Sequence, residues 1–238
     1  MMFRKTACAL TLMFSGLSIA QPAAATTTIL ITYTGTVSDG FDVSGLFGES
    51  NTSLKGDTFK SVYTLTFPTS GAVDSNVQGL HQIYGGAAYG QSNTSPLLGQ
   101  LTINGHTVFV GQDVGLHALY SPVYDPSGNF SEISDAVNTN SNTFLINYVL
   151  SNSGDNFISS LNFADELSHT VILSDVSEGS FTTPNDSGQD TYANFKNLTV
   201  LVQAVSAVPE PATWGMMIFG FGIAGVTLRV RRRETALA

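Results

Sequence analysis

The sequence has very little cysteine and few basic residues, and its central part shows no amphipathic helical pattern of three turns. The single cysteine, Cys8, lies close to the N-terminus, so the central part can contain neither disulfides nor cysteine metal ligands. Between Thr26 and Ala207 three lysines stand against sixteen acidic residues, a balance of −13. Such a surface repels polyanions, which excludes nucleic acid as a partner.

What the central part has in abundance is Ser, Thr, Asn and Gly, mixed with β-branched and aromatic residues in short runs between turn-forming segments. The Asn104-Gly105 pair predicts a two-residue hairpin turn. We expect residues 26–207 to form one all-β domain, an antiparallel β-sandwich or jelly roll. The expected strands are Thr28–Val37, Thr58–Phe67, the hairpin Leu101–Val110, Leu116–Val123, Thr143–Leu150, Phe157–Phe163, Thr170–Leu173 and Phe195–Val205.

The first residues have the pattern of a secretory signal peptide. Arg4-Lys5 form a basic start, and a mostly apolar stretch follows. Ala23 and Ala25 then match the small-x-small pattern that signal peptidase cleaves. We therefore expect residues 1–25 to be a signal peptide removed after Ala25, with signal peptidase and the secretion machinery as partners.

Near the C-terminus an apolar segment precedes a group of arginines. Residues 213–228 carry no charge, and the arginines that follow are Arg229, Arg231, Arg232 and Arg233. The segment predicts a single transmembrane helix, although it is shorter than the about 20 residues that usually cross a bilayer. Trp214 suits the headgroup interface, and the arginine side chains can reach from the helix end to the membrane surface. Four arginines directly after an uncharged run disfavour the alternative of a buried core helix. Arginines next to a span stay on the cytoplasmic side, which places residues 26–207 outside.

Just before this segment lies the triplet Pro209-Glu210-Pro211. Each proline fixes φ near −65° and removes a backbone donor, so the triplet is stiff and extended. A pre-ordered peptide loses less entropy on entering a protein groove, which favours a recognition role over that of a simple linker.

Together, the Pro-Glu-Pro triplet, Trp214, the glycine-rich apolar segment and the arginines resemble the PEP-CTERM sorting signal, in its tryptophan-bearing form. Gly215 replaces the alanine that usually follows the tryptophan. The resemblance covers 208–238 and implies recognition by exosortase, a membrane-embedded transpeptidase-like enzyme of bacteria that make exopolysaccharide. It also implies a protein held transiently in the inner membrane, with its body in the periplasm, that then moves to the cell surface or beyond; exopolysaccharide is a candidate partner.

No pattern for catalysis stands out in the body. The four histidines are scattered without paired ligand spacing, and no G-x-S-x-G motif is present. We therefore expect no enzyme activity and no cofactor. A polysaccharide hydrolase is the less favoured alternative and would need converging carboxylates. The candidates for such carboxylates are Glu49, Glu132, Glu166 and Glu178.

Two kinds of ligand remain open for the body. Asp186 and Asp190 around Gly188 are candidate calcium ligands, although ordinary turns use the same residue types. Exposed tyrosines would suit a carbohydrate-binding module, and the candidates are Tyr84, Tyr89, Tyr120 and Tyr124. The sequence thus predicts an exported cell-surface or extracellular-matrix protein whose specific ligand it does not identify.

Overall fold

The structure is a computed structural model that describes residues 27–67, 72–77, 79–86, 95–111, 115–124, 131–139, 142–151, 157–158, 160–161, 165–184, 188–206, 218 and 220–221. Nearly all of these residues belong to strands or to the turns between them. In chain order the strands are β1 (Thr27–Asp42), β2 (Thr52–Ser53), β3 (Thr58–Phe67), β4 (Val73–Val77), β5 (Leu80–Gly85), β6 (Leu97–Ile103), β7 (His106–Val110), β8 (Gly115–Tyr124), β9 (Ser131–Thr139), β10 (Phe144–Ser151), β11 (Leu167–Thr170), β12 (Val176–Thr183) and β13 (Thr191–Ser206).

All strand pairs are antiparallel, and they form one 13-stranded sheet rather than the two separate sheets of a sandwich. The order is β4-β5-β8-β9-β10-β12-β13-β1-β3-β6-β7, with β2 beside β1 and β11 beside β13. The predicted all-β class is confirmed. The sheet stays continuous because β1 and β13 are long strands that pair along their whole lengths, and register shifts near Thr34 and Val37 allow this pair to bend.

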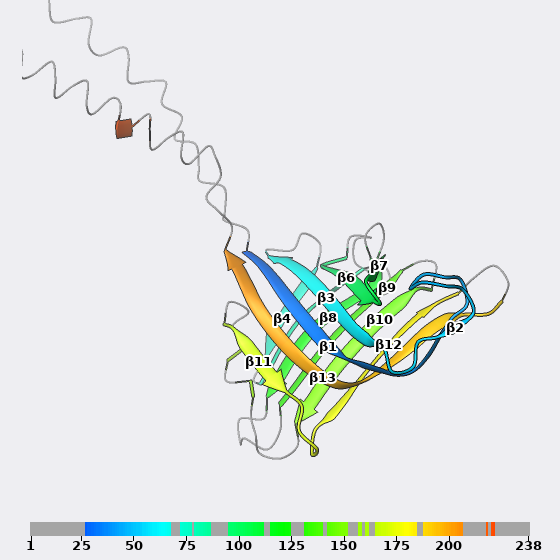
Figure 1. Ribbon diagram of the computed structural model, residues 1–238. Coiled ribbons are helices and arrows are strands. Elements are labelled where there is room, and N and C mark those ends of the chain that lie inside the picture. The colour runs from blue at the N-terminus through cyan, green and yellow to red at the C-terminus, as the bar shows by residue number, and fades with distance from the viewer. Residues whose placement is uncertain are drawn as a thin grey trace, which may run out of the picture.

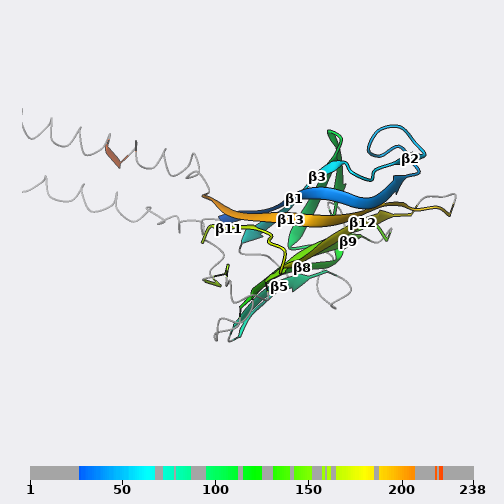
Figure 2. The same ribbon diagram turned by 60° about the horizontal axis from the view of Figure 1, so that its bottom comes forward.

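The bent sheet folds over itself into two facing layers. Figure 2 shows β1, β3 and β13 in one layer and β5, β8 and β9 in the other. In β5, β6, β9 and β10 every second side chain is buried, as expected for a sheet with one buried face. The fully buried apolar side chains include Ile29, Ile31, Tyr33, Tyr63, Leu65, Leu97, Leu101, Ile133, Val137, Leu145, Val149, Phe181, Phe195 and Val200.

Aromatic rings form much of this core. Phe59 and Phe195 stack with their ring centres 3.9 Å apart, and Tyr33 meets Tyr63 edge to face at 5.9 Å. Burying such side chains stabilises the fold by roughly 1.5 to 3 kcal/mol each.

The two ends of the described body lie side by side. Thr27, the first residue of β1, pairs with Ser206, the last residue of β13. In Figure 1 the start of the blue strand and the tip of the orange strand meet at one corner of the sheet. The segments that precede and follow the body therefore join it at the same place.

Several strands lie where the sequence predicts them. Thr58–Phe67 is β3 without change, and the Asn104-Gly105 hairpin is confirmed, with φ of 54° and 79° at its two turn residues. Both values lie in the left-handed region that a type I′ turn requires. The strands expected at 116–123, 143–150 and 195–205 correspond to β8, β10 and β13.

Other expectations were wrong. Of the strand expected at Thr170–Leu173, only Thr170 lies in a strand, as the last residue of β11. The residues after it form a turn, in which an Asp175 carboxylate oxygen accepts a hydrogen bond from the backbone N–H of Ile172. The described residues of the expected strand Phe157–Phe163 are not in a strand. Instead, its buried Ile158 and half-buried Phe157 pack against the core. Strands β2, β4, β5, β9 and β12 were not predicted.

A buried carboxylate organises the loop after β1. One Asp42 oxygen accepts hydrogen bonds from the backbone N–H groups of Gly45 and Leu46, at 2.8 and 3.0 Å, and the other accepts from Phe47 at 2.6 Å. The Thr191 hydroxyl donates to the same side chain at 3.3 Å. Asp42 thereby ties the loop to β13 and places the Phe47 ring in the core.

Candidate ligand-binding groove and sorting motif

Cross-strand pairing brings polar side chains together on the solvent side of four neighbouring strands. Tyr148 of β10 lies directly opposite Glu178 of β12, and Glu178 lies directly opposite Lys196 of β13. Directly opposite residues share one face of a sheet, so the three side chains form a row. The row borders a cavity of about 450 Å³ that we call the outer groove. Its lining residues are Ser38, Asp39, Ile146, Tyr148, Glu178, Gly179, Ser180, Asn194, Phe195 and Lys196.

Two tyrosine–carboxylate pairs flank the outer groove. The Tyr148 hydroxyl donates to Glu178 Oε2 at 3.2 Å, and the Tyr192 hydroxyl donates to Asp39 Oδ2 at 3.4 Å. Each carboxylate keeps further lone pairs that can accept hydrogen bonds from a ligand. The tyrosine bonds therefore orient the carboxylates without using up their acceptor capacity.

The charges around the outer groove are mixed. Partial burial and the nearby Glu178 carboxylate raise the pKa of Tyr148, so its hydroxyl stays a donor at neutral pH. Burial also raises the pKa of Glu132, which lies on β9 next to β10. Among the described residues Lys196 forms no ion pair, so its ammonium group can donate to a ligand.

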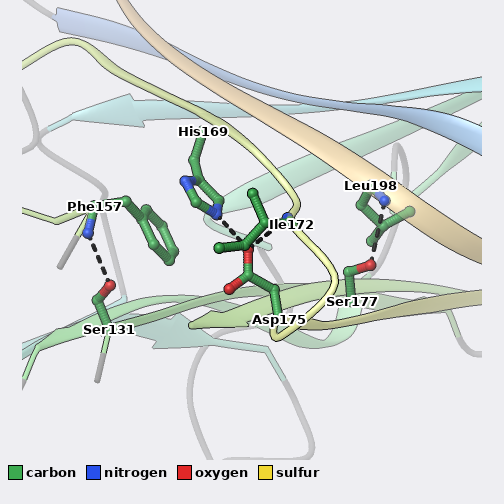
Figure 3. Close-up of polar contacts among 7 residues, drawn as sticks. All are labelled: Ser131, Phe157, His169, Ile172, Asp175, Ser177 and Leu198. Carbon is green, nitrogen blue, oxygen red and sulfur yellow. Dashed lines mark hydrogen bonds and ion pairs between the residues drawn. The ribbon is translucent and has the colours of Figure 1, made fainter. Parts of the chain in front are cut away.

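The structure places a histidine and a carboxylate together at β11, away from the outer groove. Figure 3 shows His169 Nε2 bonded to Asp175 Oδ2, at 2.8 Å, with the Phe157 ring beside it. The Phe157 and His169 rings stack at 4.2 Å. Burial alone raises the pKa of Asp175, but hydrogen bonds from the Ile172 backbone, His169 and Ser151 outweigh it and hold that pKa below its usual value.

This histidine cluster has a structural role. Ser131 and Ser177, which also appear in Figure 3, accept hydrogen bonds from the backbone N–H groups of Phe157 and Leu198. Their hydroxyls thus help to hold the chain segments around Phe157 and Leu198 in place. His169 and Asp175 close the β11–β12 turn against the sheet.

A second histidine lies near one edge of the sheet. His81 Nε2 is 2.7 Å from Asp74 Oδ1, and its Nδ1 is 2.8 Å from the carbonyl oxygen of Leu161. Both partners are acceptors, so both ring nitrogens donate only when the ring is protonated. His106 is exposed directly after the hairpin turn. Among the described residues no three His, Asp or Glu side chains form a metal-binding group.

The core itself contains two polar pairs that join the layers. The Tyr33 hydroxyl donates to Asp135 Oδ2 at 2.6 Å, and the Tyr63 hydroxyl donates to Asn147 Oδ1 at 2.9 Å. All four residues are fully buried. Burial raises the pKa of Asp135 to about 8, although the Tyr33 hydrogen bond acts in the opposite direction. Asp135 is therefore mainly protonated at neutral pH, as a carboxyl group without a counter-ion should be.

The predicted ligand residues are mostly not brought together. Of the tyrosines, Tyr84 lies on β5 and Tyr120 and Tyr124 lie on β8, whereas the outer groove uses Tyr148 with Tyr192 beside it. Tyr89 lies outside the described residues. Among the four candidate carboxylates only Glu178 lines the outer groove. Of the calcium candidates, Asp190 is exposed and Asp186 lies outside the described residues.

In the sequence, the predicted targeting segments precede β1 and follow β13. Ala23, Ala25, Pro209, Glu210, Pro211 and Trp214 are outside the described residues, as are Arg229, Arg231, Arg232 and Arg233. Within the described part of the chain, no helix is long and apolar enough to cross a membrane. The predicted span 213–228 is described only at Ile218, Gly220 and Phe221, which are helical.

The sequence continues beyond β13, the last strand of the body. The sequence profile of the PEP-CTERM protein-sorting motif matches residues 207–233, so the chain carries this motif, as the sequence predicts. The motif implies an exported protein that transits a membrane, with exosortase as its processing partner. Comparison with curated proteins and with solved structures gives no significant match.

Proposed function

We propose that this chain is a noncatalytic cell-surface or extracellular-matrix protein. In this proposal residues 1–25 direct export, the apolar segment 213–228 halts it with the arginines in the cytoplasm, and exosortase recognises Pro209-Glu210-Pro211. The main support is the position of the matched motif, which begins at residue 207, directly after β13 ends at Ser206.

The geometry of the body supports this order of events. Since Thr27 pairs with Ser206, both predicted targeting segments join the body at one end of the β1–β13 pair. Removal of either segment leaves every described strand pair intact. The body can therefore be tethered at this end during export and keep its fold after the tail is cleaved.

A noncatalytic role is supported by the carboxylates of the outer groove. Asp39 and Glu178 lie on strands on either side of β13, which separates their backbones by about 10 Å or more. Carboxyl pairs lie about 5.5 Å apart in retaining glycosidases and about 6.5 to 9.5 Å apart in inverting ones. Each carboxylate here accepts a hydrogen bond from a tyrosine hydroxyl. A polysaccharide hydrolase is therefore the less favoured alternative.

Deleting Trp214–Ala238 tests the sorting proposal. We expect the truncated protein to lose its membrane-associated intermediate and to be mislocalised, while its unfolding midpoint stays the same, because no described strand is lost. Cell fractionation and chemical denaturation of the recovered protein measure the two effects. A matched control deletes only residues 234–238, which lie beyond the matched motif, and should localise normally. Unfolding of the truncated body would show instead that the tail is structural.

A further inference from the structure

The outer groove combines an aromatic ring with groups that bind hydroxyls. Tyr148 and Ile146 of β10 supply apolar surface, and Glu178, Asn194 and Lys196 supply acceptors and donors close to it. A sugar ring has the matching chemistry, with an apolar C–H face and hydroxyls around its rim. The cavity of about 450 Å³ also lies within the roughly 300 to 1,000 Å³ range of small-molecule sites.

The charge of the outer groove restricts which class of saccharide it can bind. Asp39 and Glu178 contribute two carboxylates, and Lys196 contributes the single ammonium group of the lining. The surrounding body carries sixteen acidic residues against three lysines. An anionic polysaccharide would be repelled by this field, whereas a neutral one would not.

The groove also lies away from the end at which the tail leaves the body. Lys196 and Asn194 precede Ser206 on β13 by ten and twelve residues, which in a strand corresponds to about 33 to 40 Å. A body tethered at Ser206 would therefore present the groove well away from the membrane.

We propose that the outer groove binds a neutral saccharide, with the ring of Tyr148 against the sugar face and Glu178, Asp39 and Asn194 bonded to its hydroxyls. The proposal rests on the proposed function because it requires the body to reach saccharides outside the cell. The Tyr148–Glu178 and Tyr192–Asp39 hydrogen bonds hold the two carboxylates in place before the ligand arrives.

Saturation-transfer NMR on protein recovered from its own host tests this assignment. The probes are neutral glucose hexamers with β-1,4, β-1,3 and α-1,4 linkages, the neutral polysaccharide shed by the host, and a galacturonate hexamer as the anionic comparison. We expect at least one neutral probe to bind and the galacturonate hexamer not to bind. Tyr148→Ala should weaken binding by about tenfold through loss of the ring.

Two further variants separate ligand binding from folding. Tyr148→Phe keeps the ring but loses the hydroxyl that orients Glu178, so it should weaken binding by no more than about threefold, less than Tyr148→Ala. Phe109→Ala removes an exposed aromatic ring outside the groove and should leave binding unchanged. Binding of no neutral probe, equal binding by Tyr148→Ala, or preference for galacturonate would each overturn the proposal. Correct localisation with any of these results would overturn the saccharide assignment alone and leave the sorting proposal standing.

Discussion

Raising the pH from 6 to 8 is expected to lower the free energy of unfolding of the body by about 2 kcal/mol through Asp135 alone. The folded-state pKa of this group is about 8, compared with an ordinary value of 3.8. Between these two values the unfolded chain has released a proton that the folded protein still holds. The stabilisation is therefore fully present below about pH 4 and is lost as the pH rises through 8.

Asp135→Asn provides the decisive comparison. The amide oxygen can still accept the Tyr33 hydroxyl, but the side chain no longer ionises. Urea unfolding of both proteins at pH 6, 7 and 8 should show that the variant loses most of the pH dependence and is the more stable protein at pH 8. If the free energy of unfolding depended equally on pH in the two proteins, the ionisation of buried Asp135 could not be the cause of that dependence.

The second large effect is expected at the loop after β1. Asp42→Ala should lower the free energy of unfolding by about 3 kcal/mol or more, because three backbone N–H groups and the Thr191 hydroxyl lose their shared acceptor. The loss should also loosen Phe47, whose ring packs edge to face on Phe181 with a centre separation of 5.5 Å. Urea denaturation at pH 7 measures the change.

Glu49→Ala is the matched control for this substitution. Glu49 is an exposed acidic residue in the same loop, and its removal should change the free energy of unfolding by less than about 0.5 kcal/mol. Asp42→Asn keeps one acceptor oxygen, so its change in the free energy of unfolding should lie between those of Asp42→Ala and Glu49→Ala. A small effect of Asp42→Ala would mean that solvent can satisfy the loop amides and that the loop does not depend on the carboxylate.

The sequence predicts part of this fold because some of its signals are local. The Asn104-Gly105 turn needs only two residues with positive φ, and its prediction is confirmed. The segment Ser38-Asp39-Gly40 also looks like a local turn, but β1 continues through it. A Cβ at Gly40 would lie 2.9 Å from the carbonyl oxygen of Tyr192, so this glycine allows close approach of β13 instead of a turn.

Strand β9 escaped prediction because its buried face is partly polar. Ser131 and Asp135 occupy inward positions beside Ile133 and Val137, which obscures the alternation of apolar and polar residues. The hydrogen-bond partners of these polar positions come from distant parts of the chain: Ser131 accepts from the backbone N–H of Phe157, and Asp135 accepts from the Tyr33 hydroxyl. Tyr33 and Asp135 are 102 positions apart, and no local sequence pattern indicates that they form a pair.

The outer groove was not predicted either, because its residues are far apart in the sequence. Tyr148 and Glu178 are 30 positions apart in the sequence and become neighbours only through the register of β10 and β12. The alternation of Ile146 and Tyr148 with buried residues indicates an outward aromatic position, but it does not indicate which strands lie beside it. In contrast, the sorting motif is contiguous, so the sequence alone is enough to recognise it.

Processing by exosortase is tested most simply by the intact mass of the protein recovered from the surface or medium of its host. This mass should be compared with that of the variant that carries Pro209→Ala, Glu210→Ala and Pro211→Ala. We expect the wild-type mass to lack residues 1–25 and the C-terminal tail, and the variant to retain the tail. An intact tail in both proteins would contradict exosortase processing and would leave a simple membrane-anchored protein.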